Sequence, residues 1–301
     1  MKGLITGTAA FKAFSGDVAA DRISHAYMLH FEDAVNLRRA LKIFALEFFG
    51  VTENDPDGKR ILNETFPDLI ILPEEGKKFN AEAAASLLAD SVLKPLERDR
   101  KLFVICKFDD AAPIIQNKLL KTLEEPSAGV HFLLGATSLA PVLDTVKSRV
   151  KTLTVPPFSR KEILGALERR GGNPLNEKAA QSCGGILGVA QNMVDGGWFA
   201  EVEAAAAEIC STDRVGDVGG VALKYGDTKY KQELLNAMVL NYRNALADGG
   251  GVFERPALMY AVKCADKANR DLKFNAFFQG LLYDLMLRVI EENDKWLKLR
   301  G

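Results

Sequence analysis

The sequence lacks the cysteine spacing on which zinc sites and disulfide frameworks depend. Among its 301 residues only four are cysteines, and they stand singly without a C-x-x-C pair: Cys106, Cys183, Cys210 and Cys264. This spacing argues against a zinc knuckle and against a disulfide-stapled domain. We therefore expect free, mostly buried thiols in a reducing compartment, and no bound metal.

Long apolar runs and an excess of positive charge are missing as well. No run of about 18 apolar residues occurs, because Asp284 interrupts the best candidate near the end of the chain. Lys12 interrupts the N-terminal stretch that would otherwise resemble a signal peptide. The 39 basic residues are balanced by 40 acidic ones, which disfavours a stand-alone DNA-binding protein. We expect a cytoplasmic protein without membrane contact.

Five short β-rich runs in the first half of the chain predict a parallel sheet. They are His25–His30, Asp68–Pro73, Leu102–Lys107, His131–Thr137 and Val150–Val155. Charged residues, glycine or proline bound each run, as is common for buried parallel strands. Segments with a helical period lie between them, for example 37–48 and 84–92. This alternation predicts an α/β fold in which helices flank the sheet.

Proline and glycine pairs divide the chain into three predicted domains. Pro156 and Pro157 end the α/β domain, residues 1–156. Ser159 and Glu162 then form a capping box that opens a small helical domain, residues 157–198. No strand signal follows, so residues 199–301 are expected to form a third, all-helical domain.

The last predicted helix carries a wide apolar stripe. Its members recur at i, i+3 and i+4 and are Phe274, Phe277, Phe278, Leu281, Leu282, Leu285, Met286, Val289 and Ile290. A stripe of this kind usually faces the core of its own domain. A second interpretation stays open, in which part of the stripe contacts another subunit.

The most specific string in the sequence is N-K-L-L-K-T-L-E-E-P, residues 117–126. It reads as a helix ended by proline, and Ser148-Arg149-Val150 follows it, just before a predicted strand. The combination resembles the clamp-loader branch of the AAA+ ATPases, which carry N-x-L-L-K-x-L-E-E-P and then Ser-Arg-Cys. The resemblance extends over roughly residues 20–160. The matching positions of the string are Asn117, Leu119, Leu120, Lys121, Leu123, Glu124, Glu125 and Pro126.

The resemblance implies a nucleotide site whose phosphate loop is degenerate. The changed positions are Phe31 and Asn36 in place of glycine, Leu37 in place of lysine and Arg38 in place of serine or threonine. Glycine lets the backbone approach the phosphates, lysine neutralises their charge and the hydroxyl binds Mg²⁺. Glu32 and Asp33 add negative charge, which costs about 1 kcal/mol per pair at ~4 Å in water and ~4 at an effective dielectric of 20. We expect no bound nucleoside triphosphate and no cofactor.

Three further positions depart from the pattern of an active ATPase. Cys106 and Lys107 stand where the family has the Asp-Glu pair that binds Mg²⁺ and activates water. Asp109 and Asp110 follow closely, and we interpret them as solvated carboxylates at a helix start. Val189 stands where the family usually has a sensor arginine. Together these changes predict no hydrolysis by this chain alone.

One functional feature of the family is retained. Ser148 and Arg149 match the motif that presents an arginine finger to ATP bound by a neighbouring subunit, although Val150 replaces the usual cysteine. A guanidinium is always charged and offers a fixed fork for a γ-phosphate. The alternative for Arg149 is a surface salt bridge. Lys118 and Lys121 are candidates for DNA contact, but a solvated helix face is favoured.

A clamp-loader chain without a P-loop but with Ser-Arg resembles the bacterial delta-prime subunits of DNA polymerase III. Their four-cysteine zinc module is absent, since residues 50–66 contain no cysteine. The resemblance implies a helical lid, an oligomerising helical collar, and a hetero-oligomer with gamma/tau-like ATPase and delta-like subunits. It also implies contact with the sliding clamp and primed DNA through that complex, and a non-catalytic role. An active ATPase with an atypical pocket and a regulatory or adaptor protein outside the clamp loader are the alternatives.

Overall fold

The computed structural model describes residues 1–249, 251–272 and 276–300. The chain divides into two compact units. The first comprises Met1–Gly172 together with Cys183–Ala190, and the second comprises Asn173–Ser182 together with the chain from Gln191 onward. The three-domain division predicted from the sequence, with boundaries at residues 156 and 198, remains a prediction.

A five-stranded parallel sheet forms the centre of the first unit, in the order β2-β3-β4-β1-β5. The strands are β1 (Ala26–His30), β2 (Leu69–Leu72), β3 (Lys101–Ile105), β4 (Val130–Ala136) and β5 (Lys151–Thr154). All five predicted strands are therefore confirmed, and their ends differ from the predicted ones by at most two residues. Since the strands are parallel, their carboxyl ends meet at one edge, where Phe31 N–H still bonds Ala136 O at 2.9 Å.

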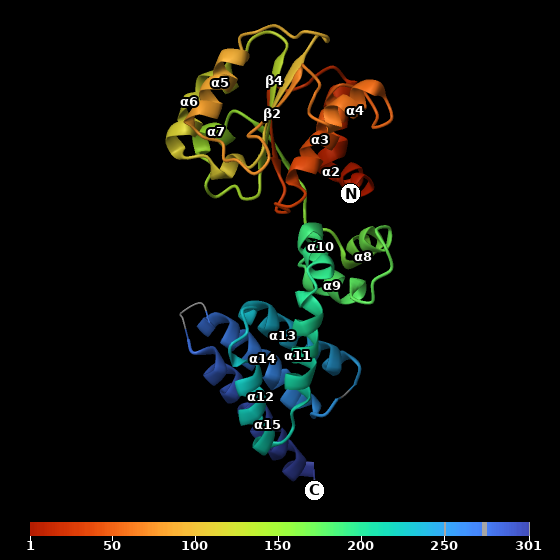
Figure 1. The fold of residues 1–301 in the computed structure, drawn as a ribbon, viewed down its shortest axis with the longest axis vertical. Helices are drawn as coiled ribbons and strands as arrows, with labels where there is room; N and C mark the ends of the chain where they lie inside the picture. Colours follow the sequence, from red (N-terminus) through yellow and green to blue (C-terminus); the bar gives the residue numbers. More distant parts are fainter. Residues whose placement is uncertain (250, 273–275, 301) are drawn as a thin grey trace. The chain divides into compact units, whose positions relative to one another are not determined.

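Helices cover both faces of this sheet, with α2–α4 on one side and α5–α7 on the other (Figure 1). In chain order, the helices up to α8 are α1 (Lys2–Gly7), α2 (Ala9–Ala19), α3 (Leu37–Phe48), α4 (Pro56–Leu62), α5 (Ala81–Asp90), α6 (Pro113–Glu124), α7 (Asp144–Lys147) and α8 (Arg160–Glu168), plus the short 3₁₀ turn η1 (Phe108–Asp110). The predicted α/β architecture is confirmed. The capping box of Ser159 and Glu162 is also confirmed at the start of α8.

Apolar side chains fill the space between each helical layer and the sheet. Phe103 and Phe132 stack on neighbouring strands with 5.5 Å between ring centroids. On the other face Phe14 of α2 packs edge-on against Tyr27 and also contacts Phe44 of α3. Burying each such side chain contributes about 1.5–3 kcal/mol to folding. Val92 does not belong to this core, contrary to its helical pattern, because α5 ends at Asp90 and leaves Val92 69% exposed.

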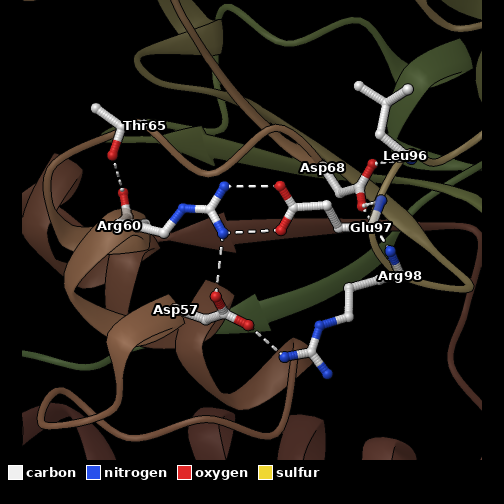
Figure 2. Close-up of polar contacts among 7 residues, drawn as sticks. All are labelled: Asp57, Arg60, Thr65, Asp68, Leu96, Glu97 and Arg98. Atoms are coloured by element: carbon white, nitrogen blue, oxygen red, sulfur yellow. Dashed lines mark hydrogen bonds and ion pairs between the residues drawn. The ribbon is translucent and has the colours of Figure 1, made fainter.

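The entry to β2 is fixed by a buried carboxylate. Asp68 is fully buried, and its oxygens accept hydrogen bonds from the backbone N–H groups of Leu96 at 2.6 Å and of Glu97 and Arg98 at 2.8 Å each. Figure 2 shows the carboxylate directed at this short loop. Three donors satisfy a charge that would otherwise be costly to bury.

Ion pairs link the same loop to α4. Arg60 bonds Glu97 through two contacts of 2.7 and 2.8 Å, and Asp57 bonds both Arg60 and Arg98 (Figure 2). In this way the cysteine-free segment 50–66 is tied to the chain just before β3. Each pair is partly exposed, so each contributes little to stability.

The second unit is built of helices, as predicted. They are α9 (Asn176–Ser182), the last part of α10 (Leu187–Asp195), α11 (Trp198–Ser211), α12 (Val215–Gly226), α13 (Lys231–Ala247), α14 (Arg255–Leu272) and α15 (Phe278–Arg300). In the part of the chain that the structure describes, no strand follows β5. None of the described helices combines the length and apolar content needed to cross a membrane.

The apolar stripe of α15 faces the core of this unit. Its buried members are Phe278, Leu282, Leu285, Met286, Val289 and Ile290. Leu281 is half-buried, and Phe277, which precedes the helix, is 72% exposed. Phe274 lies outside the described residues. Most of the stripe is therefore core, and Phe277 is the exception.

The four cysteines are free thiols, as the spacing predicted. Cys106 and Cys183 are buried, whereas Cys210 and Cys264 are partly exposed as whole residues. Burial raises the pKa of the Cys210 thiol to about 12, so this thiol is unreactive at neutral pH.

Candidate functional site

The loop between β1 and α3 occupies the place that the sequence assigned to a degenerate phosphate loop. Phe31 is buried, and its ring packs edge-on against Phe158 with 6.1 Å between centroids. Leu37, in the lysine position, is fully buried and lies over Gly135 of β4, where an added Cβ would come within 3.2 Å of Leu37 Cδ1. The side chains of Phe31 and Leu37 therefore pack in the core and are not available to contact a ligand.

Asn36 precedes α3, and its backbone N–H is already bonded. It lies 3.0 Å from Oδ1 of Asp33, whose carboxylate is buried in the same loop. The N–H groups at the start of a helix are the ones that bind phosphate in a P-loop. Here the carboxylate of Asp33 accepts the hydrogen bond from one of these N–H groups.

Arg38, in the Mg²⁺-ligand position, is committed to an ion pair. Its Nε donates to Glu64 Oε1 at 2.7 Å and its Nη1 donates to Pro73 O at 2.8 Å. Lys42 reaches the same carboxylate at 2.7 Å. The hydrogen bond from Arg38 is the main reason that the pKa of Glu64 lies below its ordinary value. These contacts hold α3 to the ends of α4 and β2.

Cys106 and Lys107 follow β3, where the family has its acidic pair. The backbone N–H of Cys106 bonds Leu72 O at 2.7 Å, and burial raises the pKa of its thiol. Lys107 is exposed and adopts a left-handed backbone conformation with φ of 56°. Neither side chain is a suitable Mg²⁺ ligand, since Mg²⁺ prefers oxygen donors.

Asp109 is not a solvated carboxylate, and that interpretation was wrong. It is only 9% exposed, and its Oδ2 accepts bonds from Thr137 N at 3.0 Å, Thr137 Oγ1 at 2.6 Å and Ser138 N at 3.0 Å. Asp110, in contrast, is exposed. An acid after β3 and a Thr-Ser pair after the adjacent parallel strand β4 are the sequence signal that predicts such a contact. Among the described residues, no group of three or more His, Cys, Asp or Glu side chains is arranged to hold a metal ion.

The N-K-L-L-K-T-L-E-E-P string occupies α6 and the turn after it. Leu119 and Leu123 are buried in the core, while Leu120 and Pro126 are half-buried. The polar members of the string are exposed: Asn117, Lys118, Lys121, Glu124 and Glu125. The helix therefore packs through its leucines and presents its charged side chains to solvent.

Gln116, just before the string, is a structural residue that the sequence did not reveal. It is fully buried and donates to Ala111 O at 2.9 Å and to Pro141 O at 3.1 Å. Its Oε1 accepts a bond from Leu143 N at 2.9 Å. These bonds fix the start of α6 to the segment that leads into α7, and so set the position of the Ser-Arg motif.

Ser148 and Arg149 follow α7, beside the end of α6. Arg149 Nε lies 2.8 Å from Glu124 Oε2, and Arg149 Nη1 donates to Thr145 O at 2.9 Å. Ser148 Oγ donates to Thr145 O at 3.1 Å and lies 3.4 Å from Arg149 Nη1. The Arg149 side chain is 31% exposed. The structure thus brings the two motifs together and holds an arginine side chain at the surface.

Comparisons with known protein sequences identify the family of this chain. The family model described as "DNA polymerase III, delta subunit" matches residues 7–159. The DNA polymerase III subunit delta' of Bacillus subtilis is 28% identical over 158 residues, which are 50% of this chain and 48% of that protein. The alignment thus spans about half of the length of that relative.

Three solved structures are similar to this chain over most of its length. A gamma subunit-related protein from Thermotoga maritima is 15% identical, with a TM-score of 0.45 over 94% of this chain and 99% of that one. The Bacillus subtilis DNA clamp loader delta protein is 12% identical, with a TM-score of 0.37 over 93% and 99%. A RuvB mutant from Thermotoga maritima is 11% identical, with a TM-score of 0.45 over 82% of each chain.

Proposed function

Because this chain belongs to the delta-prime family of DNA polymerase III clamp-loader subunits, we propose that it is the loader subunit that binds no nucleotide and lends Arg149 to a neighbour's ATP site. One observation carries the proposal. The loop after β1 carries Phe31, Asn36, Leu37 and Arg38 where a P-loop would need glycines, a lysine and a hydroxyl residue, while Arg149 is bonded to Glu124 and Thr145 at the surface.

The absence of nucleotide binding is supported by the side chains of the degenerate loop. Leu37 is buried, the Asn36 N–H bonds Asp33, and Arg38 is paired with Glu64. A nucleotide would have to displace these internal contacts and would then meet no lysine or Mg²⁺ ligand. The subunit is on this view non-catalytic and carries no cofactor.

The role of Arg149 is supported by its chemistry and its exposure. A guanidinium cannot lose its charge at neutral pH and presents several N–H donors in one plane. Supplied to a neighbour's γ-phosphate, an arginine finger accelerates hydrolysis by about 10³–10⁵-fold. Ser148 shapes the turn that carries it through its bond to Thr145.

The proposed partners follow from the family. They are gamma/tau-like ATPase and delta-like subunits in a hetero-oligomer, with the sliding clamp and primer-template DNA reached through the complex. We propose a cytoplasmic location for the protein. We also propose that residues 1–156 form the AAA+-like core, residues 157–198 a lid and residues 199–301 an oligomerising collar.

Reconstitution with the ATPase and delta-like subunits of the same loader tests the proposal. Arg149→Ala is expected to abolish the DNA-stimulated ATP hydrolysis that depends on the neighbouring site, while the complex still assembles. Arg39→Ala is the control, because Arg39 is an exposed arginine on α3, away from the motif. Full DNA-stimulated ATPase in the Arg149→Ala complex would refute the trans role.

Co-purification separates the proposal from its main alternative. A clamp-loader subunit should associate stably with an ATPase subunit that carries a complete P-loop. A chain that fails to associate with such a subunit under any nucleotide condition would instead be a regulatory or adaptor protein built on the same frame.

A further inference from the structure

Asp33 is a deeply buried acid in the loop between β1 and α3. It is 1% exposed, whereas its neighbour Glu32 is exposed. Burying a carboxylate is costly unless hydrogen bonds replace its lost hydration. The groups that surround Asp33 therefore indicate what it does.

The carboxylate bridges two segments that are far apart in the sequence. Its Oδ1 accepts a bond from Asn36 N–H at 3.0 Å, and its Oδ2 accepts one from Asn36 Nδ2 at 2.8 Å. Oδ2 also accepts the backbone N–H of Gly188 at 2.7 Å, across 155 residues of chain. Both segments belong to the first compact unit.

The two backbone donors stand at the beginnings of helices. Asn36 is the N-cap of α3, and Gly188 is the second residue of α10. The N–H groups of a first turn have no partner within their own helix and carry the positive end of its dipole. A carboxylate between two such ends receives the same kind of bonds that a P-loop gives to phosphate.

The contact is so close that only glycine fits at position 188. A Cβ added to Gly188 would lie 2.3 Å from Asp33 Oδ1 and 2.6 Å from Val35 Cβ. Real Cβ atoms do not approach other atoms this closely, so the first turn of α10 rests directly on the loop. Asp33 and Gly188 thus form one fitted contact.

We propose that Asp33 is a built-in anionic ligand of the degenerate nucleotide site. Its carboxylate takes the place of a nucleotide phosphate at the start of α3 and holds the first turn of α10 on the core when no nucleotide is bound. The first turn of α10, residues 187–190, then keeps its contact with the loop when no nucleotide is bound. A helix cap alone would act only on α3, so the effect on α10 distinguishes the two roles.

Amide hydrogen exchange of the isolated full-length chain, followed by NMR, tests this bridge. In Asp33→Asn the negative charge is lost, and the amide offers one oxygen to the three N–H donors that the carboxylate accepts. The amides of Gly188 and of residues 189 and 190 should then exchange about 10- to 100-fold faster, while amides in β3 and β4 keep their rates. Glu32→Gln removes the neighbouring exposed charge and should leave all these rates within about twofold of the unmodified chain.

Gly188→Ala provides a second variant should Asp33→Asn not fold. The added methyl group would clash with Asp33 Oδ1, so the first turn of α10 must move away, whereas the Asn36 N–H keeps its 3.2 Å bond to the backbone oxygen of Asp33. Residues 188–190 are then expected to exchange faster while the Asn36 amide stays protected. Unchanged exchange at residues 188–190 in the folded variants would overturn the proposal, and so would faster exchange at Asn36 alone.

This inference rests on the proposed absence of nucleotide binding, but the two fail separately. The exchange measurements are made without nucleotide and do not involve Arg149. If the unmodified chain bound ATP, the proposed function would fail whatever the exchange rates are. If ATP does not bind but the amide exchange of residues 188–190 does not respond to replacement of Asp33, only the proposal of a built-in ligand is wrong.

Discussion

Arg149 and Glu124 form an ion pair that joins the two motifs, with 2.8 Å between Arg149 Nε and Glu124 Oε2. They are 25 residues apart in the sequence and meet because α6 and α7 lie on the same face of the sheet (Figure 1). The carboxylate is 56% exposed, so the pair contributes little to stability. The ion pair instead orients the guanidinium of Arg149.

Glu124→Gln should therefore weaken the proposed finger without unfolding the chain. The amide removes the charge that orients Arg149, so the DNA-stimulated kcat of the reconstituted loader is expected to fall severalfold, less than in Arg149→Ala. The KM for ATP should change little, because the finger acts on the transition state in a neighbouring site. Thermal unfolding should change by less than about 1 kcal/mol.

The control for this variant is Glu168→Gln, since Glu168 is an exposed glutamate at the end of α8. It should leave kcat and KM unchanged. Glu124→Asp restores the charge and should recover part of the loss. A rise in KM with constant kcat would contradict the positioning role.

ATP binding by the isolated chain is the second prediction. We expect no saturable binding of ATP or ADP up to millimolar concentration, with or without Mg²⁺, because Leu37 is buried and Arg38 is bonded to Glu64. Equilibrium dialysis or fluorescence of a labelled nucleotide measures this. The P-loop-bearing ATPase subunit of the same loader is the positive control. Micromolar affinity in this chain would favour an active ATPase with an atypical pocket.

Much of the first unit follows from local sequence pattern. The strands are short apolar runs between charged or turn-forming residues, and the apolar face of α3 is buried as its period indicates. These features depend on neighbours in the sequence. Helices α1 and α2 were not predicted, because the apolar residues of the N-terminal stretch also fit the pattern of a signal peptide.

Contacts between segments far apart in the chain could not be predicted from local sequence pattern. Asp109 looked like a solvated acid, because nothing in its own segment indicates that Thr137 lies beside it. Asp33 looked like a charge that repels phosphate, and only the fold shows that Gly188 bonds it. In both cases the burial of a polar side chain depends on which strand ends and helix ends are brought together.

Asp68→Asn is the third prediction and concerns the entry to β2. The carboxylate accepts three backbone N–H bonds, and an amide has only one oxygen to accept them. We expect the free energy of unfolding to fall by at least about 2 kcal/mol, measured by urea denaturation. Asp99→Asn is the matched control, because Asp99 stands one residue beyond the same loop with a side chain 79% exposed. An effect of equal size in both variants would mean that loss of charge, and not the three bonds, is responsible.

The last prediction concerns acid stability and Glu64. Hydrogen bonds from Arg38 and then from Lys42 hold the pKa of this carboxyl below its ordinary value of 4.5. A lowered pKa in the folded state means that the ionised form stabilises the fold above pH 4.5. That stability is lost as the pH falls through the lowered pKa, because the folded and unfolded chains then both bind the proton.

Comparison of the unmodified chain with Glu64→Gln isolates this contribution. Urea denaturation at pH 7 should show the variant less stable by about 1–3 kcal/mol, and the difference should shrink steadily as the pH is lowered below 4.5. Other acids titrate alike in both chains, so their effects cancel in the difference. Glu75→Gln, which removes an exposed acid nearby, should show a small difference at every pH. If the difference in free energy of unfolding between the two chains did not change with pH, the instability of Glu64→Gln would come from altered packing. The contribution of the Arg38–Glu64 charge pair must instead disappear as the carboxyl group is protonated.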